Sequence, residues 1–173
     1  IVADALDGQF DVVLVRKLRS PYNPELAIGA IDETGHVHLA RHFEVDDAYL
    51  QREKEEQLGT LRQRRARYTS NRAPIDVQGR LVIVVDDGLA TGATMLAALN
   101  ATRARGPSRL VCAVPVAAPE SLALVRPHCD EVVCLAAPPE FYAVGQFYRA
   151  FPQVNDEEVI ALLAQPPRGA SAP

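Results

Sequence analysis

The sequence LVIVVDDGLATGATMLAAL, residues 81–99, decides how this chain is expected to fold. Its first five residues are apolar and lead directly into two adjacent aspartates, Asp86 and Asp87. A short loop rich in glycine and threonine follows, and the residues after it have the pattern of an amphipathic helix. The stretch therefore predicts a buried strand at 81–85, a turn, and a helix over about 94–105.

The segments around this unit predict an α/β fold. Three further apolar runs are typical of buried strands, and helical patterns separate most of them. Because strands that alternate with helices usually join one parallel sheet, we expect an open, mainly parallel sheet flanked by helices. Two short β-type runs around the sequence DETG also predict a small hairpin, or hood region. The predicted strands are 10–15, 109–116 and 131–135, and the hairpin strands are 26–31 and 36–40.

Two of the expected helices carry start signals. Asp46 and Asp47 precede a charged segment, 48–68, and aspartate is a preferred N-cap residue. Asn155 and Glu158 have the spacing of a capping box in front of a helical run.

Composition indicates a single domain, assigned to residues 1–165, followed by a disordered tail at 166–173. The net charge of −4 argues against a nucleic-acid partner. No apolar run approaches the roughly 20 residues that cross a bilayer, so no membrane partner is expected. The three cysteines are an odd number without CxxC pairs, which favours reduced thiols in a cytoplasmic protein.

The acidic pair is placed where a ligand is expected. In an open parallel sheet, ligands bind beyond the carboxyl ends of the strands, and Asp86 and Asp87 stand at such an end. Adjacent carboxylates repel each other, and partial burial strengthens the repulsion. Hydroxyl donors or a metal ion would stabilise them, and a sugar diol is a natural donor because carboxylates accept hydrogen bonds strongly.

The loop after the pair has the properties of a phosphate site. It leads into a helix N-terminus, whose backbone N–H groups and dipole favour an anion. Gly88 and Gly92 let the main chain curl around a ligand, and Thr91 and Thr94 add hydroxyl donors. The P-loop lysine and the GxGxxG spacing are both absent. A ribose 5-phosphate group would satisfy the acidic pair and the loop together.

The segment VIVVDDGLATGAT, residues 82–94, closely resembles the phosphoribosyl diphosphate (PRPP) motif of type I phosphoribosyltransferases. The sequences at 12–31 and 141–159 are similar to a bacterial group of phosphoribosyltransferases of unassigned substrate. The resemblance covers nearly the whole chain and implies the phosphoribosyltransferase fold. It implies that the acidic pair holds the ribose hydroxyls and that the loop holds the 5′-phosphate. The implied PRPP-binding residues are Asp86, Asp87, Gly88, Ala90, Thr91, Gly92, Ala93 and Thr94.

The resemblance implies a reaction in which the ribose 5-phosphate of PRPP passes to a nitrogenous base and pyrophosphate is released. Mg²⁺ is the expected cofactor and would be bound mainly through PRPP, because magnesium prefers oxygen ligands and keeps water. The family often forms dimers, so a homodimer is compatible with the sequence. The same motif also fits an alternative, a non-catalytic regulatory protein that senses PRPP or a nucleotide.

Three further residues are candidates for the predicted site, on weaker sequence signals. Arg16 and Lys17 follow the predicted strand 10–15 and would reach the same sheet edge as the acidic pair if the strands are parallel, where two cations suit a diphosphate. A solvated pair of loop residues explains them equally well. Within the aromatic segment 138–151, the piece YAVGQFY at 142–148 is loosely similar to the purine-stacking segment of hypoxanthine-guanine enzymes, which would make Tyr142 the stacking residue. Simple packing of these rings in the core is an equally good explanation.

The chain also departs from the family pattern. Position 90 is alanine where 6-oxopurine enzymes have an aspartate, so that proton-handling role is absent. Nothing before Ile1 supplies the usual first strand and its pyrophosphate turn, and we expect residues to be missing there. The basic segment 51–67 is either an exposed charged helix or, by resemblance, a mobile cover over the reacting diphosphate. The four histidines have no metal-ligand spacing, and we assign no metal site to protein residues.

Overall fold

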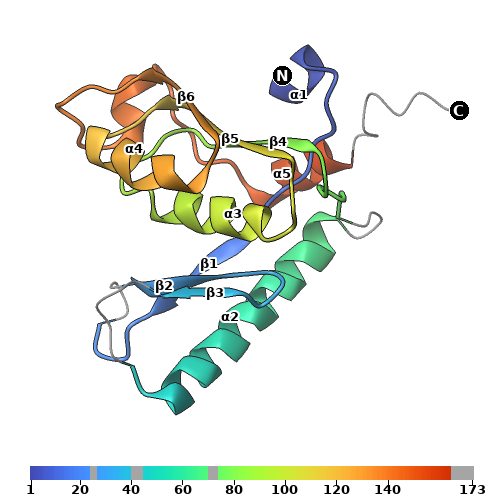
Figure 1. Ribbon diagram of the computed structural model, residues 1–173, viewed down its shortest axis with the longest axis vertical. Coiled ribbons are helices and arrows are strands. Elements are labelled where there is room, and N and C mark those ends of the chain that lie inside the picture. Colours follow the sequence, from blue (N-terminus) through green and yellow to red (C-terminus); the bar gives the residue numbers. More distant parts are fainter. Residues whose placement is uncertain (24–26, 40–44, 70–73, 165–173) are drawn as a thin grey trace, which may run out of the picture.

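The structure is a computed structural model that describes residues 1–23, 27–39, 45–69 and 74–164 (Figure 1). The tail predicted at 166–173 lies outside the described residues. Two three-stranded sheets organise the described chain, one parallel and one antiparallel.

The parallel sheet contains the predicted strand–turn–helix unit. Its strands are β4 (Leu81–Val85), β5 (Arg109–Val116) and β6 (Glu131–Ala136), in the order β4-β5-β6. Helix α3 (Ala93–Arg103) follows β4, and α4 (Pro119–Val125) with the 3₁₀ turn η1 (Arg126–His128) follows β5. These elements confirm the predicted parallel α/β arrangement.

The core of this part lies between the sheet and α3. Every second residue of β4 and β5 points to this face, as the alternation of a strand requires. Apolar side chains from α3 and α4 complete the cluster, because burying them against the sheet removes apolar surface from water. The buried members are Val84, Leu89, Met95, Ala98, Leu99, Leu110, Cys112, Val114, Ala117 and Val125.

The second sheet is antiparallel, with the strands β1 (Val15–Arg19), β2 (Ala27–Asp32) and β3 (Val37–Leu39) in chain order. The predicted hairpin is therefore confirmed, and Gly35 takes the positive φ of 88° that its turn requires. Helix α2 (Asp47–Tyr68) packs against this sheet, and α3 lies between the two sheets (Figure 1).

The predicted strand at 10–15 is wrong in its position. The observed strand is β1 (Val15–Arg19), which pairs with β2 in the antiparallel sheet. Buried Leu14 and Leu18 lie on one face of this segment, with charged residues between them. The continuous apolar run that predicts the strand ends at Val15, where the hydrogen-bonded ladder with β2 begins.

Both predicted helix caps are confirmed. The Asp46 carboxylate accepts a hydrogen bond from the Tyr49 backbone N–H at 3.0 Å, at the start of α2. Asn155 and Glu158 form the reciprocal capping box of α5 (Asp156–Leu163). The charged segment 51–67 lies within one continuous 22-residue helix, as the simpler interpretation predicted. Two small elements, α1 (Val2–Ala5) and the 3₁₀ turn η2 (Val144–Phe147), complete the described structure.

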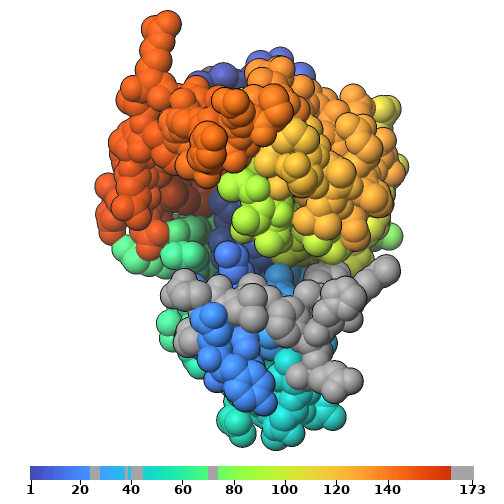
Figure 2. All heavy atoms as spheres, turned by 90° about the vertical axis from the view of Figure 1, so that its left-hand side faces the viewer, coloured from blue at the N-terminus to red at the C-terminus, as the bar shows by residue number. Residues whose placement is uncertain are grey.

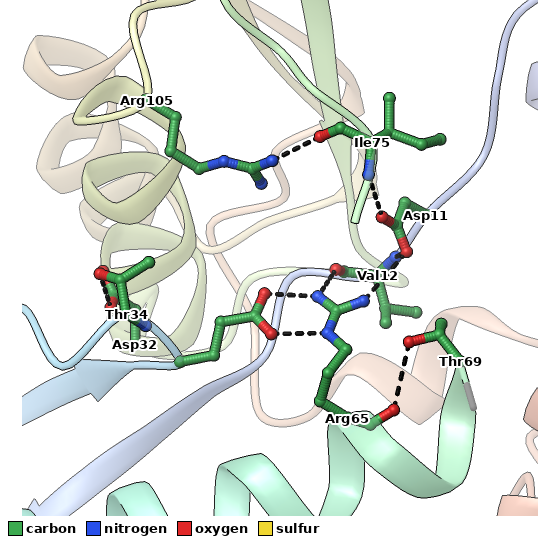
Figure 3. A network of polar contacts seen from close by, with 9 residues as sticks. Asp11, Val12, Asp32, Thr34, Arg65, Thr69, Ile75 and Arg105 are labelled. Carbon is green, nitrogen blue, oxygen red and sulfur yellow. Dashed lines mark hydrogen bonds and ion pairs between the residues drawn. The ribbon is translucent and has the colours of Figure 1, made fainter. Parts of the chain in front are cut away.

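Arg65, near the end of α2, lies at the centre of a polar cluster that connects the antiparallel sheet with the segment before β4 (Figure 3). Its guanidinium contacts Glu33 through two hydrogen bonds and donates to Asp11 at 3.1 Å and to the Val12 carbonyl at 2.8 Å. Asp11 in turn accepts from the Ile75 backbone N–H at 3.0 Å, on the segment that leads into β4. The cluster therefore fixes α2 and the hairpin relative to the parallel sheet.

Cys112, Cys129 and Cys134 are free thiols, in agreement with the prediction. Burial raises the pKa of Cys112 to about 11. Within the described parts of the chain, every helix is too short or too polar to pass through a membrane.

Candidate functional site

The acidic pair lies directly after β4, at the carboxyl end of the parallel sheet. The Asp86 backbone N–H donates to the Ala113 carbonyl of β5 at 3.3 Å, so the first acid is still attached to the sheet. The Asp87 backbone N–H turns back and donates to the Asp86 carboxylate at 3.0 Å. The Asp86 side chain is half-buried and that of Asp87 is exposed. The pair therefore has one acid facing inward and one facing outward.

The surroundings of Asp86 disfavour its ionised form. Burial raises the pKa of Asp86 above its ordinary value, and the neighbouring charge of Asp87 raises it further. The hydrogen bond from the Asp87 N–H opposes this change but does not reverse it. A group that donates hydrogen bonds to Asp86 would offset this cost, as the sequence predicted.

The loop then returns to the sheet before it enters α3. The Leu89 backbone N–H donates to the Val116 carbonyl at 3.0 Å, and the Ala118 N–H donates to the Leu89 carbonyl at 2.9 Å. Gly92 is the N-cap of α3 with a φ of 72°, a left-handed conformation that favours glycine. The first amides of a helix have no partner within the helix, so α3 offers donors at this point.

These residues enclose a pocket of about 150 Å³. Figure 2 shows the yellow-green residues of this region next to orange residues from the C-terminal third of the chain. Two predicted site residues, Asp87 and Ala93, adjoin the lining residues in sequence but do not line the pocket. The lining consists of Asp86, Gly88, Leu89, Ala90, Thr91, Gly92, Thr94, Met95 and Val144.

Helix α4 packs against the loop. The Ser121 hydroxyl, which is buried, donates to the Ala90 carbonyl at 2.8 Å. A Cβ on Gly92 would lie 3.4 Å from both Ser121 and Val125, so the helix packs closely under the glycine. Sequence reasoning missed Ser121. Its position at the start of the helix that follows a parallel strand was the available signal, because such helix starts lie at the ligand-binding edge.

The C-terminal aromatic segment closes the other side. Val144 lines the pocket, and its methyl groups lie against Gly88. The Tyr148 hydroxyl donates to the Asp87 carbonyl at 2.6 Å. Sequence reasoning singled out this segment for its aromatic content but selected Tyr142, whose side chain is 85% exposed and does not line the pocket. The stacking role of Tyr142 stays a prediction.

Arg16 and Lys17 do not lie where the sequence placed them. Both are inside β1, in the antiparallel sheet, rather than at the end of a parallel strand. The Arg16 guanidinium donates to the Gln57 side chain of α2 at 2.6 Å, and Lys17 is exposed. Neither residue lines the pocket. The physical reason is the register of β1, whose inward positions face α2.

Among the residues that the structure describes, no group of three or more histidine, cysteine, aspartate or glutamate side chains is arranged to hold a metal ion. His42 lies outside those residues. Asp86 and Asp87 are hard oxygen donors that suit Mg²⁺, but two carboxylates leave most of its ligands to water or a substrate.

The fold and the pocket define an α/β protein whose site lies at the carboxyl ends of its parallel strands. Residues 1–151 match the family described as "Phosphoribosyl transferase domain". The chain belongs to this family.

The relatives agree with this assignment. A Mycobacterium tuberculosis protein named "Putative phosphoribosyl transferase" is 43% identical over 166 residues, which are 94% of this chain and 38% of that protein. Nearly all of this chain matches these curated relatives, but it spans only about two fifths of their length. The crystal structure of TT1426 from Thermus thermophilus is 46% identical, with a TM-score of 0.83, over 94% of this chain and 78% of that one. A uracil phosphoribosyltransferase of Kineococcus radiotolerans is 42% identical over 62 residues, 36% of this chain and 29% of that enzyme.

Proposed function

We propose that this chain binds PRPP and transfers its ribose 5-phosphate to a nitrogenous base, with release of pyrophosphate. One observation carries the proposal: the pocket brings Asp86 together with the loop from Gly88 to Thr94 at the N-terminus of α3. A carboxylate, which suits a sugar diol, and a helix N-terminus, which suits a phosphate, therefore adjoin the same pocket, and a ribose 5-phosphate needs both. Family membership supports the same interpretation.

In the proposed complex, Asp86 and Asp87 accept hydrogen bonds from the ribose hydroxyls. The amides of 91–94 and the hydroxyls of Thr91 and Thr94 hold the 5′-phosphate. A nitrogen of the acceptor forms a bond to C1′ while the bond from C1′ to the diphosphate oxygen breaks, and the electron pair leaves with pyrophosphate. Positioning and charge stabilisation supply the rate enhancement.

Two parts of the chemistry draw on groups other than the pocket side chains. Bound Mg²⁺ would neutralise charge on the diphosphate and would be held mainly by PRPP oxygens and water. Ala90 offers no acid or base, so the proton of the acceptor nitrogen must leave to solvent or to the departing pyrophosphate. The pyrophosphate role of Arg16 and Lys17 stays a prediction, because the guanidinium of Arg16 is bound to Gln57.

Pyrophosphate release tests the proposal. The chain is incubated with PRPP, Mg²⁺ and a panel of bases that includes uracil, which the partial matches to uracil phosphoribosyltransferases favour, and adenine. We expect release with at least one base, and a large loss of release with Asp87→Asn. Asp7→Asn, at an exposed aspartate, is the matched control and should keep the rate.

Together with a measurement of PRPP binding, the release assay separates the alternative function. Binding of PRPP without release for any base would favour a sensor of PRPP or of a nucleotide over a transferase. An absence of PRPP binding by the unmodified chain would refute both functions.

A further inference from the structure

The main chain at Asp87 is held by a residue far away in sequence. Asp86 and Leu89 are attached to β5 through backbone hydrogen bonds, on either side of Asp87. The Asp87 carbonyl instead accepts the hydroxyl of Tyr148, at 2.6 Å, across a separation of 61 residues. Tyr148 thus provides one contact between the turn that carries the outer acid and the C-terminal segment.

Tyr148 is itself fixed in place. Its ring packs on that of Phe151, with the centroids 5.1 Å apart, and Phe151 also lies against Gly145. Gln146 braces the same segment, because its side chain accepts from the backbone N–H groups of Tyr142 and Ala143, each at 3.0 Å. Burial, and then the charges of Asp87 and Asp86, raise the pKa of Tyr148 above its ordinary value, so the hydroxyl stays a donor at neutral pH.

A second contact between the same two segments is close packing at Gly88. A Cβ added there would lie 2.8 Å and 3.0 Å from the two methyl groups of Val144. The turn after β4 is therefore held by hydrogen bonds to β5 on one side and by contacts with the C-terminal segment on the other. A change in that segment would be transmitted to the outer acid of the pair.

We propose that Tyr148 is a positioning residue that orients the Asp87 carboxylate toward the sugar of a bound phosphosugar. The inference rests on the proposed function, since it assigns the sugar to the acidic pair. It also separates the two halves of the site: Tyr148 acts on the turn at Asp87, whereas the phosphate half lies on 91–94 and is braced by Ser121. Loss of the Tyr148 hydroxyl should therefore affect sugar binding and spare phosphate binding.

Calorimetric titration with ribose 5-phosphate and with inorganic phosphate tests this separation. Tyr148→Phe keeps the ring and removes the hydroxyl. Tyr49→Phe is the matched control, because the Tyr49 hydroxyl also donates to a main-chain carbonyl, that of Arg19, at 3.0 Å, but in the antiparallel part of the molecule. We expect Tyr148→Phe to weaken ribose 5-phosphate binding about 3- to 10-fold, the range for one lost hydrogen bond, and to leave phosphate affinity within about 2-fold. Tyr49→Phe should leave both affinities unchanged.

Hydrogen exchange of the unmodified chain gives a second measurement that needs no variant. Ribose 5-phosphate should slow exchange at 142–148 as well as at 86–94, whereas inorganic phosphate should slow exchange only at the loop and the start of α3.

The outcomes distinguish this inference from the proposed function. If the unmodified chain binds no ribose 5-phosphate, both fail. If it binds the sugar phosphate and Tyr148→Phe binds it equally well, the positioning role alone is refuted. Equal weakening of sugar phosphate and phosphate binding would also refute it, because it would show a general structural role.

Discussion

The close packing at Gly88 leads to a quantitative prediction for the variant Gly88→Ala. The added Cβ would lie 2.8 Å and 3.0 Å from the methyl groups of Val144 and 3.0 Å from the Val116 carbonyl. The carbonyl has little freedom to move, because it accepts the Leu89 N–H at 3.0 Å. Overpacking of this kind costs about 1–3 kcal/mol of unfolding free energy. For a chain of this size, that corresponds to a melting temperature lower by about 2–12 °C.

A double-mutant cycle tests the assignment of this strain. Val144→Ala removes both methyl groups from the position of the new Cβ, while the contact with the Val116 carbonyl remains. The double variant Gly88→Ala/Val144→Ala should therefore be more stable than the sum of the two single effects predicts, by about 0.5–3 kcal/mol. The free energies come from urea unfolding, with the melting temperatures as a check.

Gly59→Ala provides the control of opposite sign. Gly59 lies inside α2, and a Cβ added there would meet no atom within 4 Å. Alanine is the better helix former, so this variant should gain about 0.5–1 kcal/mol. The reasoning would be refuted if Gly88→Ala were as stable as the unmodified chain, or if its effect and that of Val144→Ala were simply additive.

Three further changes have defined outcomes. Asp86→Asn should lower PRPP affinity yet stabilise the ligand-free chain. Because folding raises the Asp86 pKa, the ionised carboxylate costs stability as pH rises through that pKa. The gain in unfolding free energy, measured in urea, should therefore be present at neutral pH and vanish at acidic pH, and an equal gain at both would contradict the prediction. Arg65→Ala should cost about 2–4 kcal/mol in the same assay because it leaves Glu33 and Asp11 without their guanidinium partner; a loss below about 0.5 kcal/mol would contradict this. The unfolding free energy of Thr102→Val should be higher than that of the unmodified chain or at most about 0.5 kcal/mol lower, because the buried Thr102 hydroxyl has no hydrogen-bond partner among the described residues. A larger loss would show that the hydroxyl does have a partner.

The sequence alone predicts the elements that are stabilised by residues close to one another in the chain. The strand 81–85 ends in a turn because Asp86 and Asp87 cannot continue a buried apolar run. The caps at Asp46 and Asn155 are satisfied within three residues of themselves, so their sequences carry the whole interaction. The hairpin also follows local rules, with Gly35 in the conformation that glycine favours.

Features that depend on distant partners could not be predicted in the same way. Strand β1 is defined by its pairing with β2 and by burial against α2, so the apolar run at 10–15 gave the wrong position for Arg16 and Lys17. Val144 and Tyr148 reach the acidic turn only through tertiary packing. The aromatic segment that contains both residues stands out in the sequence, but nothing in it indicates a contact with the acidic turn.

The most direct test of the proposed site is a crystal structure of the chain with ribose 5-phosphate. The account predicts ribose hydroxyls within hydrogen-bond distance of Asp86 and Asp87, and the phosphate on the backbone amides of 91–94. A ligand bound elsewhere, with both carboxylates turned to solvent and the pocket beneath Val144 empty of sugar, would contradict it.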